Sequence, residues 1–112
     1  MSEDDGRIFI GVLRAVLHIP GARSLKDGRQ VAHSLRDRIR HRFEVSVHEV
    51  EPSESASRRV LLVTTAGNDG RVITATLDRV RALLYASGDA VVVDVDVDVF
   101  RWHPAAEGNR ES

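Results

Sequence analysis

The stretch Leu17-His-Ile-Pro-Gly-Ala-Arg-Ser-Leu-Lys-Asp-Gly-Arg-Gln30 decides the fold, because it ends one regular element and begins another. Pro20 and Gly21 stop the apolar run that comes before them. Ser24-Leu-Lys-Asp27 fits a helix-starting box, in which the serine caps free amide groups and an acid three residues later reaches back. The stretch therefore predicts a strand that ends near residue 19 and a helix over about Ser24 to Arg42.

The same kind of pattern extends along the rest of the chain. Residues 7–19 are almost continuously apolar or β-branched, which is typical of a strand buried on both faces. Alternation predicts further strands over 43–50, 59–65 and 90–102, and 3.6-residue spacing predicts a second helix over 69–86. In that helix Val72, Ile73, Leu77, Val80, Leu83 and Leu84 share one side, and Gly88 lies where a left-handed helix stop is expected. In the last strand the odd-numbered valines from Val91 to Val99 are expected on one face.

The order strand, helix, strand, strand, helix, strand predicts an α+β fold of the ferredoxin-like βαββαβ type. Right-handed crossovers place the strands in the order 4-1-3-2 in one antiparallel sheet, with both helices on one face. We expect a single domain over residues 7–102, flanked by disordered tails at 1–6 and 103–112. The polar segment 52–57 is expected to be the most mobile loop.

Composition narrows the classes of function. With no cysteine among 112 residues, the chain has no disulfide, thiolate nucleophile or cysteine-ligated zinc. It contains no catalytic triad, metal-ligand cluster or phosphate loop of recognised spacing, so we expect no cofactor and a non-enzymatic role. The N-terminus is acidic, and no apolar run reaches the roughly 20 residues of a membrane helix. These features predict a cytoplasmic protein.

The first predicted helix carries most of the positive charge. Residues 23–42 have a net charge of +5, although the whole chain has a formal charge of −1. Spacings of three and four align one row over about 21 Å of helix, formed by Lys26, Arg29, His33, Arg36 and Arg40. Such a row could follow a phosphate backbone, with arginines as paired donors. A solvated helix surface is the simpler interpretation.

Arg23 and Ser24 form a second, weaker candidate site. They lie at the start of the first helix, where free amide groups and the helix dipole favour an anion. An acylphosphatase-type enzyme uses a comparable loop on this fold. Asp27 would compete for the same amides, however, and a capping box explains both Ser24 and Asp27 without a ligand.

The face of the sheet that the helices leave uncovered is expected to be partly apolar, since Ile8, Ile10, Val12 and Val16 lie on it. We therefore expect a homodimer that buries this face. Asp94, Asp96 and Asp98 lie on the same face. Alternate side chains of a strand are too far apart to chelate one ion as neighbours, so we interpret these residues as a charged surface, with Arg14 as a cross-strand partner.

Four segments carry a resemblance to a known family. Gly11-Val-Leu-Arg14, Leu17 to Asp27, Arg42-Phe-Glu-Val-Ser-Val47 and the run Val91-Val-Val-Asp-Val-Asp-Val97 resemble the YlxP-like family of small bacterial proteins of unknown function. Gly28 departs from that family's pattern, which usually has a basic residue there. The resemblance implies a ferredoxin-like domain whose gene commonly lies beside those of translation and ribosome-maturation factors.

Three functions remain open after these observations. The first is a non-enzymatic protein that binds RNA or a ribosomal assembly through the first helix. The second, an alternative of another class, is a dimeric module for small-molecule sensing or scaffolding. The third is an acylphosphatase-like phosphate-ester hydrolase.

Overall fold

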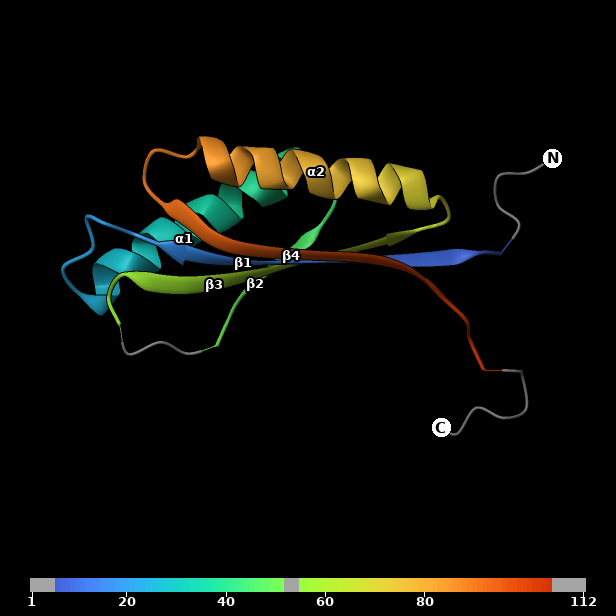
Figure 1. The fold of residues 1–112 in the computed structure, drawn as a ribbon, viewed down its shortest axis with the longest axis horizontal. Helices are drawn as coiled ribbons and strands as arrows, with labels where there is room; N and C mark the ends of the chain where they lie inside the picture. The colour runs from blue at the N-terminus through green and yellow to red at the C-terminus, as the bar shows by residue number, and fades with distance from the viewer. Residues whose placement is uncertain (1–5, 52–54, 106–112) are drawn as a thin grey trace.

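The computed structural model describes residues 6–51 and 55–105. Its elements are β1 (Ile8–His18), α1 (Leu25–Arg42), β2 (Ser46–Val50), β3 (Arg58–Gly67), α2 (Gly70–Ala86) and β4 (Val91–Trp102). The four strands form one antiparallel sheet in the order β2-β3-β1-β4 (Figure 1). This is the predicted ferredoxin-like arrangement. The ends of the expected tails, residues 1–5 and 106–112, and part of the expected mobile loop, residues 52–54, lie outside the described residues.

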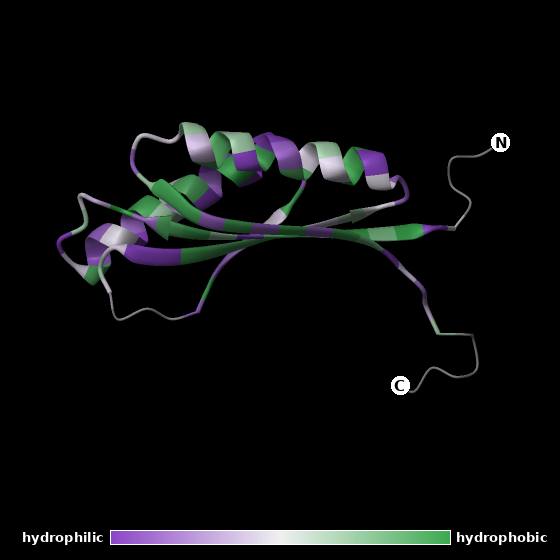
Figure 2. Ribbon diagram, viewed as in Figure 1, coloured by the Kyte–Doolittle hydropathy of each residue, from purple (hydrophilic) through white to green (hydrophobic). Residues whose placement is uncertain are grey.

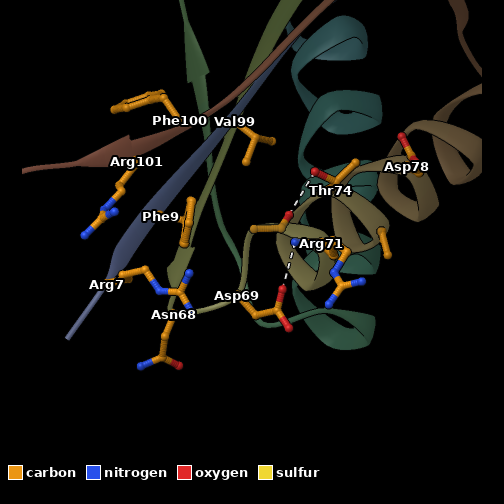
Figure 3. A pocket seen from close by; sticks show the side chains of 12 residues that line it. Arg7, Phe9, Asn68, Asp69, Arg71, Thr74, Asp78, Val99, Phe100 and Arg101 are labelled. Carbon is orange, nitrogen blue, oxygen red and sulfur yellow. Dashed lines mark hydrogen bonds between the residues drawn. The ribbon is translucent and has the colours of Figure 1, made fainter. Parts of the chain in front are cut away.

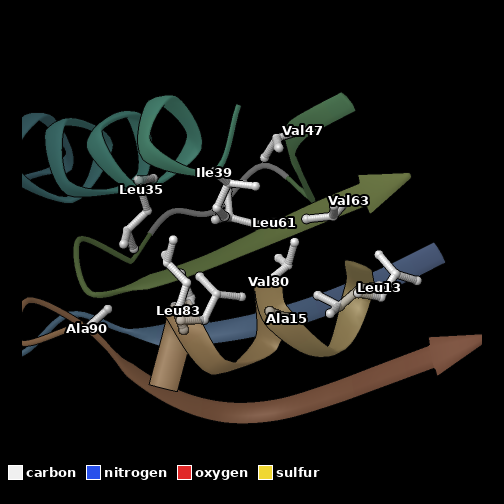
Figure 4. Close-up of a cluster of buried hydrophobic side chains, with 14 of the residues drawn as sticks. Leu13, Ala15, Leu35, Ile39, Val47, Leu61, Val63, Val80, Leu83 and Ala90 are labelled. Atoms are coloured by element: carbon white, nitrogen blue, oxygen red, sulfur yellow. The ribbon is translucent and has the colours of Figure 1, made fainter. Parts of the chain in front are cut away.

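Both helices pack on the same face of the sheet. α1 contacts β2 and β3, whereas α2 contacts mainly β1 and β4. Figure 4 shows Leu35 and Ile39 of α1, together with Val80 and Leu83 of α2, around side chains from the strands. They belong to one core that also contains Leu13, Ala15, Leu17, Leu61 and Val63. In Figure 2 the strands are mostly hydrophobic, while both helices carry hydrophilic positions.

The first helix begins with the predicted cap. The amide of Asp27 donates to Ser24 Oγ at 3.2 Å, and Asp27 Oδ2 accepts from the amide of Arg23 at 3.0 Å. The acid therefore reaches back one residue beyond the serine. These two bonds satisfy donors that the helix itself leaves unpaired.

Close packing explains Gly28. It is buried, and a Cβ at this position would lie 2.2 Å from the carbonyl oxygen of Ala56 and 2.9 Å from Arg59 Nε. A side chain of any kind would push α1 away from the start of β3. The residue therefore allows the first turn of α1 to approach the strand closely.

Three details of the secondary-structure prediction are wrong. The second strand begins at Ser46 rather than residue 43, because Phe43 caps α1 and donates its amide to the carbonyl of Ile39. Gly88 is not a left-handed helix stop: α2 ends at Ala86, Ser87 caps it with φ −68°, and Gly6 is the sole described glycine with positive φ. Val72 was assigned to the buried side of α2, but it is 60% exposed.

The face assignment in the last strand is wrong at its start. The register between β1 and β4 shifts between Val16 and Leu17, so that Val16 pairs with Asp94 and Leu17 pairs with Val92. Val93 is the extra residue of this bulge and is 63% exposed. As a result Val92, rather than Val91 or Val93, packs against the core beside Val95 and Val99.

Candidate nucleic-acid interface

The predicted basic row lies on the flank of α1 that faces β2, the edge strand. Arg40 shows this directly, since its Nη2 donates to the backbone carbonyl of Val47 in β2 at 3.3 Å. Lys26, Arg29 and Arg40 are exposed, whereas His33 and Arg36 are half-buried. Arg36 Nε also pairs with Asp37 Oδ1 at 3.1 Å. The structure therefore brings the five residues together on one flank, with three of them exposed.

Further arginines extend this positive surface beyond the row. α1 and α2 together contain nine basic residues and three acidic residues, Asp27, Asp37 and Asp78. All nine basic side chains except Arg36 are exposed. Within residues 6–51 and 55–105, Arg36 is also the only one of the nine within ion-pair distance of a carboxylate. The helical layer thus has a net charge of +6. Only one of its basic side chains, Arg36, is paired with a carboxylate in the described part of the chain.

Five of the nine were not in the predicted row: Arg38, Arg42, Arg71, Arg79 and Arg81. The structure brings two of these together, Arg42 and Arg79. They line one pocket of about 490 Å³ where the end of α1 meets the start of α2, together with exposed Val72. The Arg42 guanidinium stacks 5.7 Å from the centre of the Phe43 ring. Glu44 and Asp69 line the same pocket, so it has mixed charge. Its arginines therefore add to an open positive surface and do not form a closed anion site.

A larger pocket, of about 830 Å³, lies at the start of α2 (Figure 3). Phe9 and Val99 line it from the strands, and Arg7 and Arg101 extend from the strand side while Arg71 extends from α2. Asp69 Oδ1 already accepts the amide of Arg71 at 3.0 Å, as a helix cap. The cap carboxylate would repel an anion at this helix start.

The predicted anion site at Arg23 and Ser24 is occupied by groups of the chain itself. The amide of Arg23 donates to Asp27, and Ser24 Oγ accepts the amide of Asp27. The amide of Gly28 is bonded to the carbonyl of Ser24 at 3.2 Å. A phosphate would therefore have to displace the carboxylate of Asp27.

The opposite face of the sheet carries the negative charge. Asp94, Asp96 and Asp98 are exposed on β4, and Arg14 Nη1 lies 4.0 Å from Asp96 Oδ2. The nearer partner of Arg14 is Glu51, whose Oε2 accepts from Arg14 Nε at 3.0 Å and also from Arg14 Nη2. This hydrogen bond lowers the pKa of Glu51 and raises that of Arg14. The molecule is therefore positive over its helices and mainly negative over its open sheet face.

Comparison with known proteins places the chain in a family. A family model described as "Protein of unknown function (DUF503)" matches residues 10–97. The chain belongs to this family. The matched region of DUF503 begins in β1 and ends in β4, so it includes both helices and the first part of β4 with Asp94 and Asp96.

Two other comparisons add little to the DUF503 assignment. No curated protein matches the chain. Among solved structures, "De novo designed protein Foldit4" is similar with a TM-score of 0.47 and 14% identity, over 83% of this chain and 96% of that one. No described helix is long and apolar enough to span a membrane.

Proposed function

We propose that this protein binds RNA through the outer surface of its two helices. The observation that supports the proposal is the positive layer just described, in which eight exposed basic side chains from α1 and α2 lack carboxylate partners within the described part of the chain. Unpaired cations on one side of a small protein bind polyanions by releasing condensed counterions. α1 alone, at 18 residues, gives a binding surface about 27 Å long.

The choice of RNA over other polyanions rests on the resemblance to the YlxP-like family, which implies genes beside translation and ribosome-maturation factors. The open sheet face is an unsuitable RNA surface, because Asp94, Asp96 and Asp98 would repel phosphates there. The basic row of α1, together with Arg42 and Arg79 of the pocket between the helices, would therefore contact the RNA backbone. Such contacts position the protein without reading base sequence.

The test is a binding titration with a structured RNA at several salt concentrations. Arg29→Gln/Arg79→Gln removes one exposed charge from each helix, and we expect it to lower the affinity about tenfold and to reduce the slope of log K against log salt by about 1 to 2. Arg29→Lys/Arg79→Lys is the matched control, since it keeps both charges at the same positions. Arg58→Gln, on the opposite face, makes a single charge change that should have little effect.

Two results would contradict the proposal. One is an absence of binding by the unchanged protein at about 50 mM salt, where electrostatic binding is strong. The other is equal loss of affinity in the glutamine and lysine variants, because it would mean that charge is irrelevant. Equal affinity for duplex DNA of the same sequence would contradict the choice of RNA.

A further inference from the structure

The sheet face opposite the helices is apolar at one end. Ile8 lies beside Trp102 in the register of β1 and β4, and Ile10 lies beside Phe100. Phe100 and Trp102 are 41% and 43% exposed, although large aromatic side chains are normally well buried. Val12 and, on β3, Leu62 continue the apolar surface toward the middle of the sheet. A contiguous exposed patch of this kind marks an interaction surface.

The two long edges of this face have different chemistry. On the β4 edge the exposed carboxylates of Asp94, Asp96 and Asp98 form an acidic strip. On the β2 edge the same face carries Ser46, His48 and Val50, because their partners in β3 are Thr64, Leu62 and Val60. Glu49, the one acid of β2, points to the helix side, where it pairs with Arg59. One edge therefore offers acceptors, and the other offers hydrogen-bond donors, because the carboxylate of Glu51, just after β2, is already paired with Arg14 and Arg58.

We infer that a second copy of this chain covers the open face, with a two-fold axis parallel to the strands. Rotation about such an axis lays β4 of each copy over β2 of the other and β1 over β3. At the level of the residues paired across the sheet, Asp96 comes opposite His48 of the partner subunit and Asp98 comes opposite Ser46 of the partner subunit. The acidic strip thus meets the edge that carries the donors Ser46 and His48.

The other in-plane axis, perpendicular to the strands, gives a poor match. When this axis passes through the middle of the sheet, at the level of Asp96, it lays β4 over β4, so that the strips of Asp94, Asp96 and Asp98 from both copies face each other. Like charges that meet across an interface strongly disfavour an arrangement. It also places the apolar end of one face on the polar end of the other. Charge complementarity therefore selects the axis parallel to the strands.

The shape of the sheet supports the same axis. β2 has 5 residues and β4 has 12, so the ladder between β2 and β3 ends at the pair Ser46–Thr64. Beyond it a side-chain bond from Thr65 Oγ1 to the carbonyl of Glu44 is present, and Ala66 is exposed at an open corner. The strand-parallel rotation brings Phe100 and Trp102 of the partner subunit to this corner. Four strands about 4.8 Å apart and about ten residues long give a footprint near 600 Å² per copy, which reaches the lower range of specific interfaces.

Cross-linking tests the axis, because the chain has no cysteine of its own. Facing sheets lie about 10 Å apart, beyond disulfide reach, so the reagent is a short bifunctional maleimide. We expect His48→Cys/Asp96→Cys to give a covalent dimer, while His48→Cys and Asp96→Cys alone do not. A dimer from Asp96→Cys alone would overturn the strand-parallel axis, and so would no dimer from the double variant.

A second experiment tests the face itself without any nucleic acid, so its outcome is independent of the proposed RNA binding. Sedimentation should show a dimer of the unchanged protein at micromolar concentration. Phe100→Glu should raise the dissociation constant about 30-fold or more. Tyr85→Glu is the matched control, since Tyr85 is a 56% exposed aromatic on α2 and should leave the dimer intact. A monomer at every concentration, or equal effects of both variants, would overturn the inference.

Discussion

Arg59 Nη2 donates a hydrogen bond to the backbone carbonyl of Leu25 at 2.6 Å, which ties the start of β3 to the first turn of α1. The arginine is only 6% exposed, and its Nη1 pairs with Glu49 Oε2 of β2 at 2.8 Å. Three elements therefore meet at one buried guanidinium, directly beneath the helix that carries the basic row. Its position controls how α1 sits on the sheet.

Replacement of Arg59 by alanine should lower the free energy of unfolding by about 3 kcal/mol, because it leaves Glu49 half-buried without its partner. Urea unfolding measures the change. Arg58→Ala is the matched control: Arg58 is the next residue, its side chain is 47% exposed, and its ion pair with Glu51 should contribute less than about 1 kcal/mol. Similar losses from both substitutions would mean that burial of Arg59 has no special effect.

Replacement of Gly28 by alanine should destabilise the protein by about 1 to 3 kcal/mol, despite the better helix propensity of alanine. The new Cβ would meet the carbonyl oxygen of Ala56 at 2.2 Å, so backbone must move. Gly21→Ala serves as the control, since a Cβ there meets nothing within 4 Å. Thermal unfolding compares the two variants, and an unchanged melting temperature for Gly28→Ala would disprove the close approach.

The cap of α1 gives a third prediction. Ser24→Ala removes the oxygen that accepts the amide of Asp27, and we expect a loss of about 1 kcal/mol. Ser34 provides the comparison, because it is exposed in the middle of the same helix, where alanine is favoured by about 0.5 kcal/mol. The two serine substitutions should therefore change stability in opposite directions in chemical denaturation.

Glu51 gives a prediction about pH. The hydrogen bond from Arg14 lowers the pKa of Glu51 below its ordinary 4.5, so ionised Glu51 stabilises the folded state. This contribution is fully present above the unfolded pKa and disappears as the pH falls through the lower folded pKa. The stability difference between the unchanged protein and Glu51→Gln should be constant above about pH 5.5 and shrink below pH 4.5. A difference that is the same at pH 3 and pH 7 would contradict it.

The order of elements and the cap of α1 could be predicted because both depend on local patterns. Ser24 and Asp27 are three residues apart, and the strands follow alternation that is visible without any partner. The Val93 bulge could not be predicted in this way, since it depends on the pairing of β4 with β1. The burial of Arg59 could not be predicted either, because arginine is normally exposed. Its pairing with Glu49 depends on the register of β2 and β3, which local patterns do not give.

The candidate interface could likewise be predicted only where it depends on residues close together in the sequence. The row from Lys26 to Arg40 lies within one helix, so spacing alone aligned it. Arg42 and Arg79 belong to different helices, 37 residues apart, and only the packing of α1 beside α2 brings them to one pocket. The predicted pairing of Arg14 with the acidic strand is confirmed at Asp96, but its nearer partner Glu51, which follows β2 and reaches across the face, could not be predicted from local patterns.

The bond from Arg40 to the carbonyl of Val47 also limits how copies of the chain can associate. β2 is an outer strand, and this side chain occupies one of its backbone acceptors. At the other margin, β4 combines the Val93 bulge with a row of aspartates. Both margins thereby resist the addition of a further strand, which is how sheets grow into fibres. A two-fold association through the open face would therefore end at two copies, because neither margin of the sheet is left ready to pair with a further strand.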